Sequence, residues 1–144
     1  QSVEPGDCYL FEDNKDELEH FINSSEKVIK YNNTQNAKLC KIIITPSCDI
    51  AQKKLINHRF LSGIIIDDDA IDSKKSRDDY YCIGPFILDT KIKFLILNFQ
   101  TFSSVKPEKI DFSKRLFTLK TAILNDIQSK AANHVNRIGI IKLD

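Results

Sequence analysis

Residues 80–99 read YYCIGPFILDTKIKFLILNF, and this stretch decides the fold class. It holds two runs rich in β-branched and aromatic residues, Tyr80 to Leu88 and Ile92 to Phe99. Only Asp89-Thr90-Lys91 separates them, which is a connection of hairpin length. Strands joined by so short a turn are antiparallel, because parallel neighbours need a long crossover. The stretch therefore predicts two paired antiparallel strands.

Further strand signals lie on both sides of this hairpin. Residues 37–45 contain Leu39-Cys40-Lys41-Ile42-Ile43-Ile44, a β-branched run that Pro46 stops, and Arg59 to Ile66 forms the next run. Shorter signals occur at Cys8 to Phe11 and at Thr101 to Val105, the latter predicted as an edge strand. Several short strands close together predict a small antiparallel SH3-like barrel of five or more strands.

Helical periodicity appears near both ends of the chain. Residues 14–22 repeat apolar side chains at helical spacing, and Asp13 is the predicted N-cap. Residues 121–137 form an amphipathic pattern that we expect to end at Gly139 and to pack on the sheet. The packing residues are expected to be Ile123, Ile127 and Val135. Residues 1–144 are thus predicted to be a single mixed β/α, mainly β, domain.

Composition favours a globular protein without excluding many functions. Of 144 residues, 42% are hydrophobic and 28% charged, and the net charge of +1 by itself predicts no polyanion partner. The charge is uneven, because residues 1–26 are acidic and residues 27–60 basic. No apolar run reaches the length of a membrane span, and no signal peptide is visible, so a cytoplasmic location is expected. The chain begins at Gln1 and lacks methionine, which favours a piece of a longer protein.

The four cysteines are predicted to be reduced. Cys8, Cys40 and Cys82 each lie in an apolar strand-like run, where a free cysteine packs as a small hydrophobic residue. The fourth, Cys48, lies in a polar stretch. Residues 67–79, with six acidic and three basic residues, are predicted to form a mobile loop.

The most concentrated polar group is Thr45-Pro46-Ser47-Cys48-Asp49, followed by Lys53. One interpretation is structural, with Asp49 capping the following turn through backbone N–H groups and Cys48 packed inward. A second is recognition or nucleophilic chemistry, because nearby lysines lower the pKa of a thiol. A third is half of a zinc site with His58. The chain has no glycine-rich phosphate loop, CxxC, HExxH or GxSxG motif, so no cofactor and no metal are predicted.

The stretch Ile44-Thr45-Pro46-Ser47-Cys48-Asp49-Ile50 resembles the T-x-x-C-D segment of small bacterial and phage-related domains. Those domains open with a "GD" strand, which Gly6-Asp7 matches. They close with a helix similar to residues 126–132 followed by Arg137-Ile138-Gly139, and residues 98–105 resemble their middle segment. Some of them are fused to receiver-like domains in signalling or phage-defence proteins. The resemblance implies a module of such a protein.

The layout also resembles the MazF/PemK-like toxins, which are SH3-like barrels with an opening "GD" strand. Gly6-Asp7, Gln100, Arg115-Leu116 and the final helix follow in the family's order. The family's ribonucleases carry an arginine in the first loop, where this chain offers Lys15, and Asp67-Asp68-Asp69 stands where RNA binds in that family. The resemblance therefore implies the fold rather than the nuclease activity.

The expected function is that of a non-catalytic binding or regulatory module in a bacterial defence or signalling protein. Its partner is expected to be another protein, a neighbouring domain or a nucleic acid. The expected contact surface consists of Thr45, Cys48, Asp49, Lys53 and Arg137. The alternatives are a MazF-like endoribonuclease toxin and an enzyme or sensor that uses Cys48.

Overall fold

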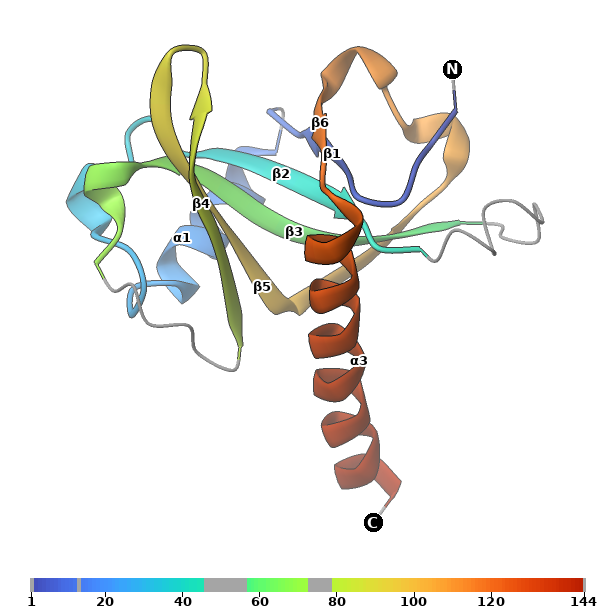
Figure 1. Cartoon of the computed structure of the whole chain (residues 1–144). Helices are drawn as coiled ribbons and strands as arrows, with labels where there is room; N and C mark the ends of the chain where they lie inside the picture. The colour runs from blue at the N-terminus through green and yellow to red at the C-terminus, as the bar shows by residue number, and fades with distance from the viewer. Residues whose placement is uncertain (1, 13, 46–56, 73–78, 144) are drawn as a thin grey trace.

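The computed structural model describes residues 2–12, 14–45, 57–72 and 79–143, with Tyr31 and residues 135–143 described by their backbone only. The described residues form one antiparallel sheet of six strands in the order β4-β5-β3-β2-β1-β6 (Figure 1). This confirms the predicted mainly β class with a small, curled antiparallel sheet. The strands are β1 (Asp7–Leu10), β2 (Lys38–Ile43), β3 (His58–Asp67), β4 (Tyr80–Leu88), β5 (Lys91–Val105) and β6 (Arg115–Thr118).

Two α-helices flank the sheet, as predicted. Helix α1 (Lys15–Ser24) begins after Asn14, whose side chain accepts a hydrogen bond from the backbone of Glu17 at 3.0 Å. Asn14, not Asp13, is therefore the N-cap, and Asp13 lies outside the described residues. Helix α3 (Thr121–Leu143) runs through Gly139, so the predicted end there was wrong. The described residues also form short 3-10 turns: η1 (Tyr31–Asn33), η2 (Asp68–Ala70), η3 (Pro107–Lys109) and η4 (Phe112–Lys114).

The sheet is curled, and its two edge strands approach each other across one face. Phe86 of β4 and Phe117 of β6 pack edge to face, with ring centroids 5.7 Å apart. We call this concave side the inner face. Its core is built from residues such as Cys40, Ile42 and Leu97, and it extends to both edge strands. The chain thus forms a half-barrel that is completed by side chains between β4 and β6.

Helix α3 closes one end of the half-barrel. Ile127 and Ala131 are buried in the inner core, and Ile123 packs against it. The Gln128 side chain donates a hydrogen bond of 3.1 Å to the carbonyl of Ile44, just past the end of β2. The predicted packing through Ile123 and Ile127 is therefore confirmed, whereas the side chain of Val135 lies outside the described residues.

Helix α1 covers the opposite, outer face. Phe21 and Ile22 of α1 pack with Ile64 and Ile66 of β3 in a second core. A third, smaller core lies on the same outer face around Tyr9 and is covered by residues near Ile110. No helix among the described residues is long and apolar enough to span a membrane.

Three details of the sheet differ from the sequence predictions. Residues 101–105 are not a separate edge strand, because β5 continues through them and pairs with β3 past a register shift. Lys27 to Tyr31, which is also a candidate strand from its sequence, contributes only an isolated bridge between Ile29 and Ile71. Strand β6 was not predicted, and it pairs with β1 at the edge of the sheet.

The segment 67–79 is partly docked rather than a mobile loop. Asp67 ends β3, and Ala70 of η2 is fully buried in the outer core. The Lys30 amide donates to the Ala70 carbonyl at 2.7 Å, and the Asp72 amide donates to Val28 at 3.1 Å. The prediction was therefore wrong for residues 67–72, because one small apolar residue anchors this charged stretch. Residues 73–78 lie outside the described part of the chain.

Candidate ligand-binding site

The residues singled out from the sequence divide into one that the structure describes and four whose side chains it does not. Thr45 is fully buried, and its hydroxyl oxygen accepts a hydrogen bond from the Arg59 amide at 2.8 Å. Because the Ile44 amide also donates to the Arg59 carbonyl at 3.0 Å, Thr45 extends the pairing of β2 and β3. Cys48, Asp49 and Lys53 lie outside the described residues, and Arg137 is described by its backbone in α3.

A pocket of about 420 Å³ opens at the end of the half-barrel that α3 leaves uncovered. The start of β2, the end of β4 and the start of β5 contribute to it, whereas α3 contacts the opposite ends of β2 and β4. We call this pocket the barrel mouth. It is lined by Leu10, Gln35, Asn36, Ala37, Lys38, Ile65, Leu88, Asp89, Lys91, Lys93 and Leu116.

Three lysines of the barrel mouth lie on the inner face of the sheet. Lys38 alternates along β2 with the inward residues Cys40 and Ile42. Lys91 of β5 is paired with Leu88 of β4, which packs against the inner core, and Lys93 of β5 is paired with Asp67 of β3. Paired residues point to the same side of a sheet. The ends of two strands, β2 and β5, thus place three ammonium groups around one opening.

One of these lysines is neutralised within the protein. The Lys93 ammonium forms an ion pair with Asp67, which also accepts a hydrogen bond of 2.9 Å from the side-chain amide of Asn36. The hydrogen bond from Lys93, followed by that from Asn36, holds the pKa of the Asp67 carboxyl below its ordinary value. Asp67 is therefore an ionised partner that fixes both side chains.

The other two lysines are free to meet a ligand. Lys38 and Lys91 are exposed, and neither forms an ion pair with any described residue. Below them lies an apolar floor of Ile65, which is 3% exposed, with Leu10, Leu88 and Leu116 around it. Pockets that combine apolar walls with a few placed polar groups are typical small-molecule sites, and the mouth of a barrel is a frequent location for them.

The rim of the barrel mouth includes a strained turn. Asp89 and Thr90 connect β4 to β5 with φ angles of +51° and +66°. Such left-handed backbone is uncommon for residues other than glycine, and especially so for a β-branched one. The turn places Asp89 at the pocket and Lys91 directly after it.

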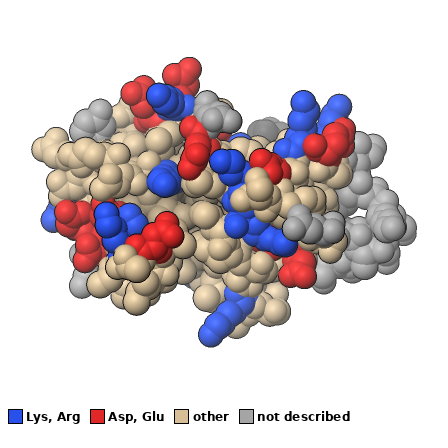
Figure 2. Space-filling model, turned by 90° about the horizontal axis from the view of Figure 1, so that it is seen from above, with Lys and Arg blue, Asp and Glu red and all other residues tan. Residues whose placement is uncertain are grey.

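Seen from above, lysine and arginine side chains are interspersed with acidic ones, without one large patch of a single sign (Figure 2).

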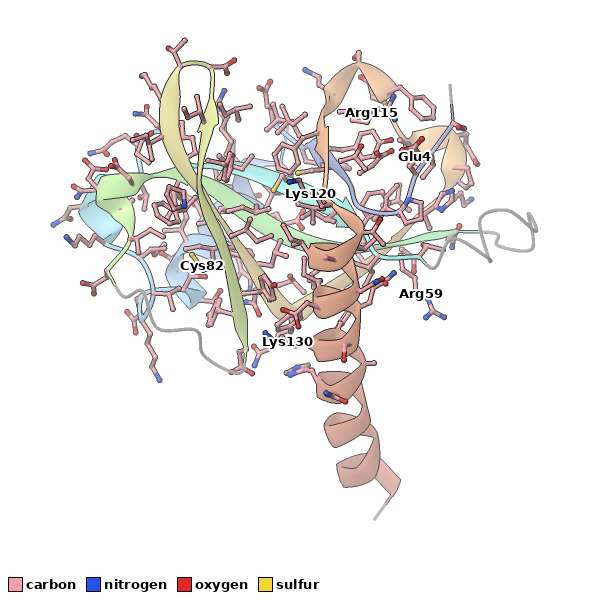
Figure 3. The ribbon with its side chains drawn as sticks, in the orientation of Figure 1. Glu4, Arg59, Cys82, Arg115, Lys120 and Lys130 are labelled. Carbon is pink, nitrogen blue, oxygen red and sulfur yellow. The ribbon has the colours of Figure 1, made fainter. Side chains whose placement is uncertain are left out.

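A buried carboxylate lies on the outer face, where β1 meets β6. Asp7 is fully buried and accepts hydrogen bonds from the Glu4 amide, the Tyr9 hydroxyl, Arg115 and Thr118, at distances of 3.0, 2.9, 3.2 and 2.6 Å. Glu4 and Arg115 lie at this edge in Figure 3. Burial and the hydrogen bond to Asp7 raise the pKa of Tyr9 far above its ordinary value. Because four donors satisfy its two oxygens, Asp7 has a structural role.

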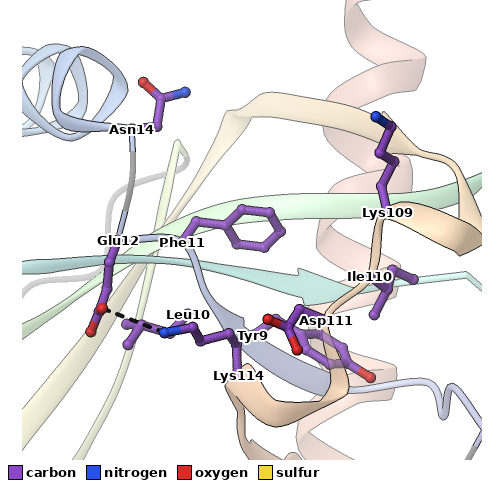
Figure 4. A pocket seen from close by; sticks show the side chains of 9 residues that line it. All are labelled: Tyr9, Leu10, Phe11, Glu12, Asn14, Lys109, Ile110, Asp111 and Lys114. Atoms are coloured by element: carbon purple, nitrogen blue, oxygen red, sulfur yellow. Dashed lines mark ion pairs between the residues drawn. The ribbon is translucent and has the colours of Figure 1, made fainter.

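A second pocket, of about 360 Å³, lies between the β1–α1 connection and the η3–η4 segment (Figure 4). The Glu12 carboxylate and the Lys114 ammonium face each other across it at 3.6 Å. Lys109 and Asp111 also line it, so its charges balance. This pocket therefore selects for neither cations nor anions, and the barrel mouth is the better candidate.

The described thiols are poorly suited to nucleophilic chemistry. Cys8, Cys40 and Cys82 lie in β1, β2 and β4, as predicted, and all three are free. The neighbouring Cys8 thiol and burial raise the pKa of the Cys40 thiol, and burial raises that of Cys82. Among the described residues, no group of three or more histidine, cysteine, aspartate or glutamate side chains is placed to hold a metal ion.

The lysines of the barrel mouth were missed in the sequence because Lys38 and Lys93 lie in strands, where a lysine is normally assigned to the solvent side, and Lys91 was placed in the turn between two strands. The available signal was their spacing. Lys91 and Lys93 are two residues apart and therefore share a face of the sheet, and Lys38, two residues before Cys40, lies on the same face as Cys40.

Comparison of the chain with protein-family models, curated proteins and solved structures gives no match.

Proposed function

We propose that this domain is a non-catalytic binding module whose ligand places an anionic group in the barrel mouth. The observation that carries the proposal is the position of Lys38 and Lys91, two unpaired cations on the inner face above an apolar floor. Neither ammonium has an ion-pair partner among the described residues, and both lie at the opening of the same pocket.

The physical basis is charge-assisted hydrogen bonding in a partly enclosed site. An anion between Lys38 and Lys91 accepts hydrogen bonds from both ammonium groups, each worth about 1.5–3 kcal/mol where a charge is involved. The apolar floor lowers the local dielectric and strengthens these contacts. Lys93 adds little to this attraction because Asp67 already neutralises it.

Binding rather than catalysis is favoured by the protonation states at the barrel mouth. Hydrogen bonds from Lys93 and Asn36 lower the pKa of Asp67, which makes this carboxylate a weak base. The partner protein, neighbouring domain or nucleic acid expected from the sequence must then present its anionic group here. The endoribonuclease and cysteine-based alternatives stay predictions, and no described contact favours either of them.

Titration with inorganic phosphate, followed by two-dimensional NMR, tests this proposal. We expect amide shifts to change at residues 35–38 and 88–93. The double variant Lys38→Glu, Lys91→Glu should lose this response, whereas Lys109→Glu, an exposed lysine on η3, should keep it. Both mouth lysines are exposed, so the double variant is expected to fold. An unchanged spectrum in inorganic phosphate, or an equal response in the double variant, would refute the proposal.

A further inference from the structure

We infer that the ligand of the barrel mouth is a nucleotide with an amino-bearing base; this inference rests on the function proposed above. The barrel mouth offers three kinds of chemistry, and a simple inorganic anion uses only one of them. Two lysines attract an anion, an aliphatic floor receives a flat apolar group, and a set of oxygen acceptors requires donors.

The acceptors come from one carboxylate and two amides. The Asn36 amide nitrogen donates to Asp67 at 2.9 Å, and the Gln35 amide nitrogen donates to the carbonyl of Asn32 at 2.8 Å. Each amide therefore keeps a carbonyl oxygen for a ligand. Asp89 lines the same pocket and forms no ion pair with a described residue. A ligand that fits must carry several N–H or O–H donors besides its anionic group.

The charge balance limits how negative the ligand can be. Lys38, Lys91 and Lys93 contribute three positive charges, and Asp67 and Asp89 contribute two negative ones, which leaves a net charge of one. Asp89 repels a polyphosphate, whereas a single phosphate group held by Lys38 and Lys91 is tolerated. One phosphate, hydroxyl and amino donors, and a planar ring form the outline of a nucleoside monophosphate.

The apolar floor distinguishes a nucleotide from a sugar phosphate. Ile65, Leu88 and Leu116 come from three different strands and present aliphatic carbon to the pocket. A base ring buries apolar area against such a surface, and a ribose phosphate without a base does not. The volume of about 420 Å³ lies in the range of roughly 300–1,000 Å³ that small-molecule sites occupy.

Binding of five probes separates this inference from the proposal on which it rests. AMP should bind at least about tenfold more tightly than ribose 5-phosphate, as measured by isothermal titration calorimetry, because of the base contacts. Inorganic phosphate should bind weakly at the same lysines, and adenosine more weakly than AMP. A 5′-phosphorylated oligoadenylate shows whether the ligand is a free nucleotide or part of a nucleic acid. If the site recognises a nucleic acid, the oligoadenylate should bind more tightly than AMP.

Asp89→Asn supplies the sharper test, because asparagine tolerates the same left-handed backbone. This variant should weaken AMP binding by about tenfold and strengthen inorganic phosphate binding, since a charged acceptor and a repulsive charge are lost together. Asp16→Asn, at an exposed position of α1, should change neither AMP binding nor phosphate binding. Two results would overturn the inference and leave anion binding intact. One is equal affinity for AMP and ribose 5-phosphate. The other is a change of AMP affinity and phosphate affinity in the same direction in Asp89→Asn. Absence of binding by every probe, including phosphate, would overturn both.

Discussion

The Asp7 carboxylate shows how a single side chain fixes an edge of this sheet. It is buried without exposure to solvent, and it connects β1 to β6 through Arg115 and Thr118. Strand β6 has only four residues, so its backbone pairing with β1 is short. Three side-chain donors converging on one carboxylate stabilise that pairing.

Asp7→Ala should lower the free energy of unfolding by about 3–5 kcal/mol, because it leaves the buried Tyr9 hydroxyl and Arg115 without their acceptor. Denaturation in urea measures the change. Asp111→Ala, which removes an exposed capping carboxylate from η4, serves as the control and should cost much less. Similar losses in the two variants would show that the Asp7 network contributes no more than an ordinary cap.

Tyr81 gives the docking of α3 a pH dependence at alkaline pH. Its hydroxyl donates to Asp126 of α3 at 2.6 Å, and the Lys130 ammonium lies 4.7 Å from its ring centre. Burial, and then the hydrogen bond to Asp126, raise the pKa of Tyr81 from 10.0 to about 12. The folded state therefore favours the neutral phenol, and its contribution to stability is complete below pH 10 and is lost as the pH rises to about 12.

Urea denaturation at a series of pH values between 9 and 12, run on the parent protein and on Tyr81→Phe, measures this effect. The parent protein should lose stability more steeply over this range than the variant, which has no phenol to ionise. Identical pH profiles for the two proteins would contradict the assignment. Tyr80→Phe is a matched control, because the Tyr80 hydroxyl donates instead to the Ser24 carbonyl of α1.

At the scale of single elements, the β4–β5 hairpin combines a strained turn with a two-sided surface. Leu88 and Lys91 point toward the barrel mouth, while Ile87 and Ile92, which are paired with each other, are 76% and 50% exposed on the other side. The turn between them uses Asp89 and Thr90 in left-handed conformations. A two-residue hairpin turn normally has glycine at its second position.

Thr90→Gly should therefore raise the free energy of unfolding by about 1 kcal/mol, because glycine adopts this backbone without the steric cost that threonine bears. Thermal denaturation measures the gain. Ser104→Gly, at an exposed position of β5, should instead destabilise the protein by about 0.5–1 kcal/mol. A loss of stability in Thr90→Gly would show that the threonine side chain stabilises the turn.

The elements differ in how well the sequence predicts them. Strands β3 and β4 carry long β-branched runs and were predicted close to their bounds, whereas β5 was predicted to end at Phe99 and continues to Val105. Strand β6 was missed because Arg115–Thr118 is short, contains one charged residue, and becomes a strand only through its pairing with β1. The end of α3 was misplaced because glycine commonly ends a helix, whereas α3 continues through Gly139.

For the whole molecule, the sheet and α3 form the unit that holds the inner core. Ile127 is fully buried between them, and its substitution by alanine should lower the free energy of unfolding by about 2–5 kcal/mol. Asn125→Ala, on the exposed side of the same helix, should change it by less than about 0.5 kcal/mol. Denaturation in urea compares them, and equal stability of the two variants would mean that α3 is not part of the folded unit.

The candidate site could be predicted only in part because it depends on curvature. The sequence predicts that Lys38 and Lys93 lie in strands and that Lys91 lies in the turn between two strands, but only the curl of the sheet brings the ends of β2 and β5 around one opening. The position of Asp67, which neutralises one of these lysines, follows from the register between β3 and β5. Pairing over such sequence distances is not encoded in any short motif.

The contact between Phe86 and Phe117 has a mechanical consequence. Strands β4 and β6 stand at opposite ends of the strand order, so aromatic rings rather than a backbone ladder join the two margins of the sheet. Such a pair of rings is worth about 0.5–1.5 kcal/mol beyond its buried area, far less than a row of ladder bonds. The half-barrel is therefore most easily deformed along this seam, the line of contact between β4 and β6. Because Leu88 and Leu116 flank it at the pocket, widening the seam by a small amount enlarges the cavity while every pairing within the sheet stays intact.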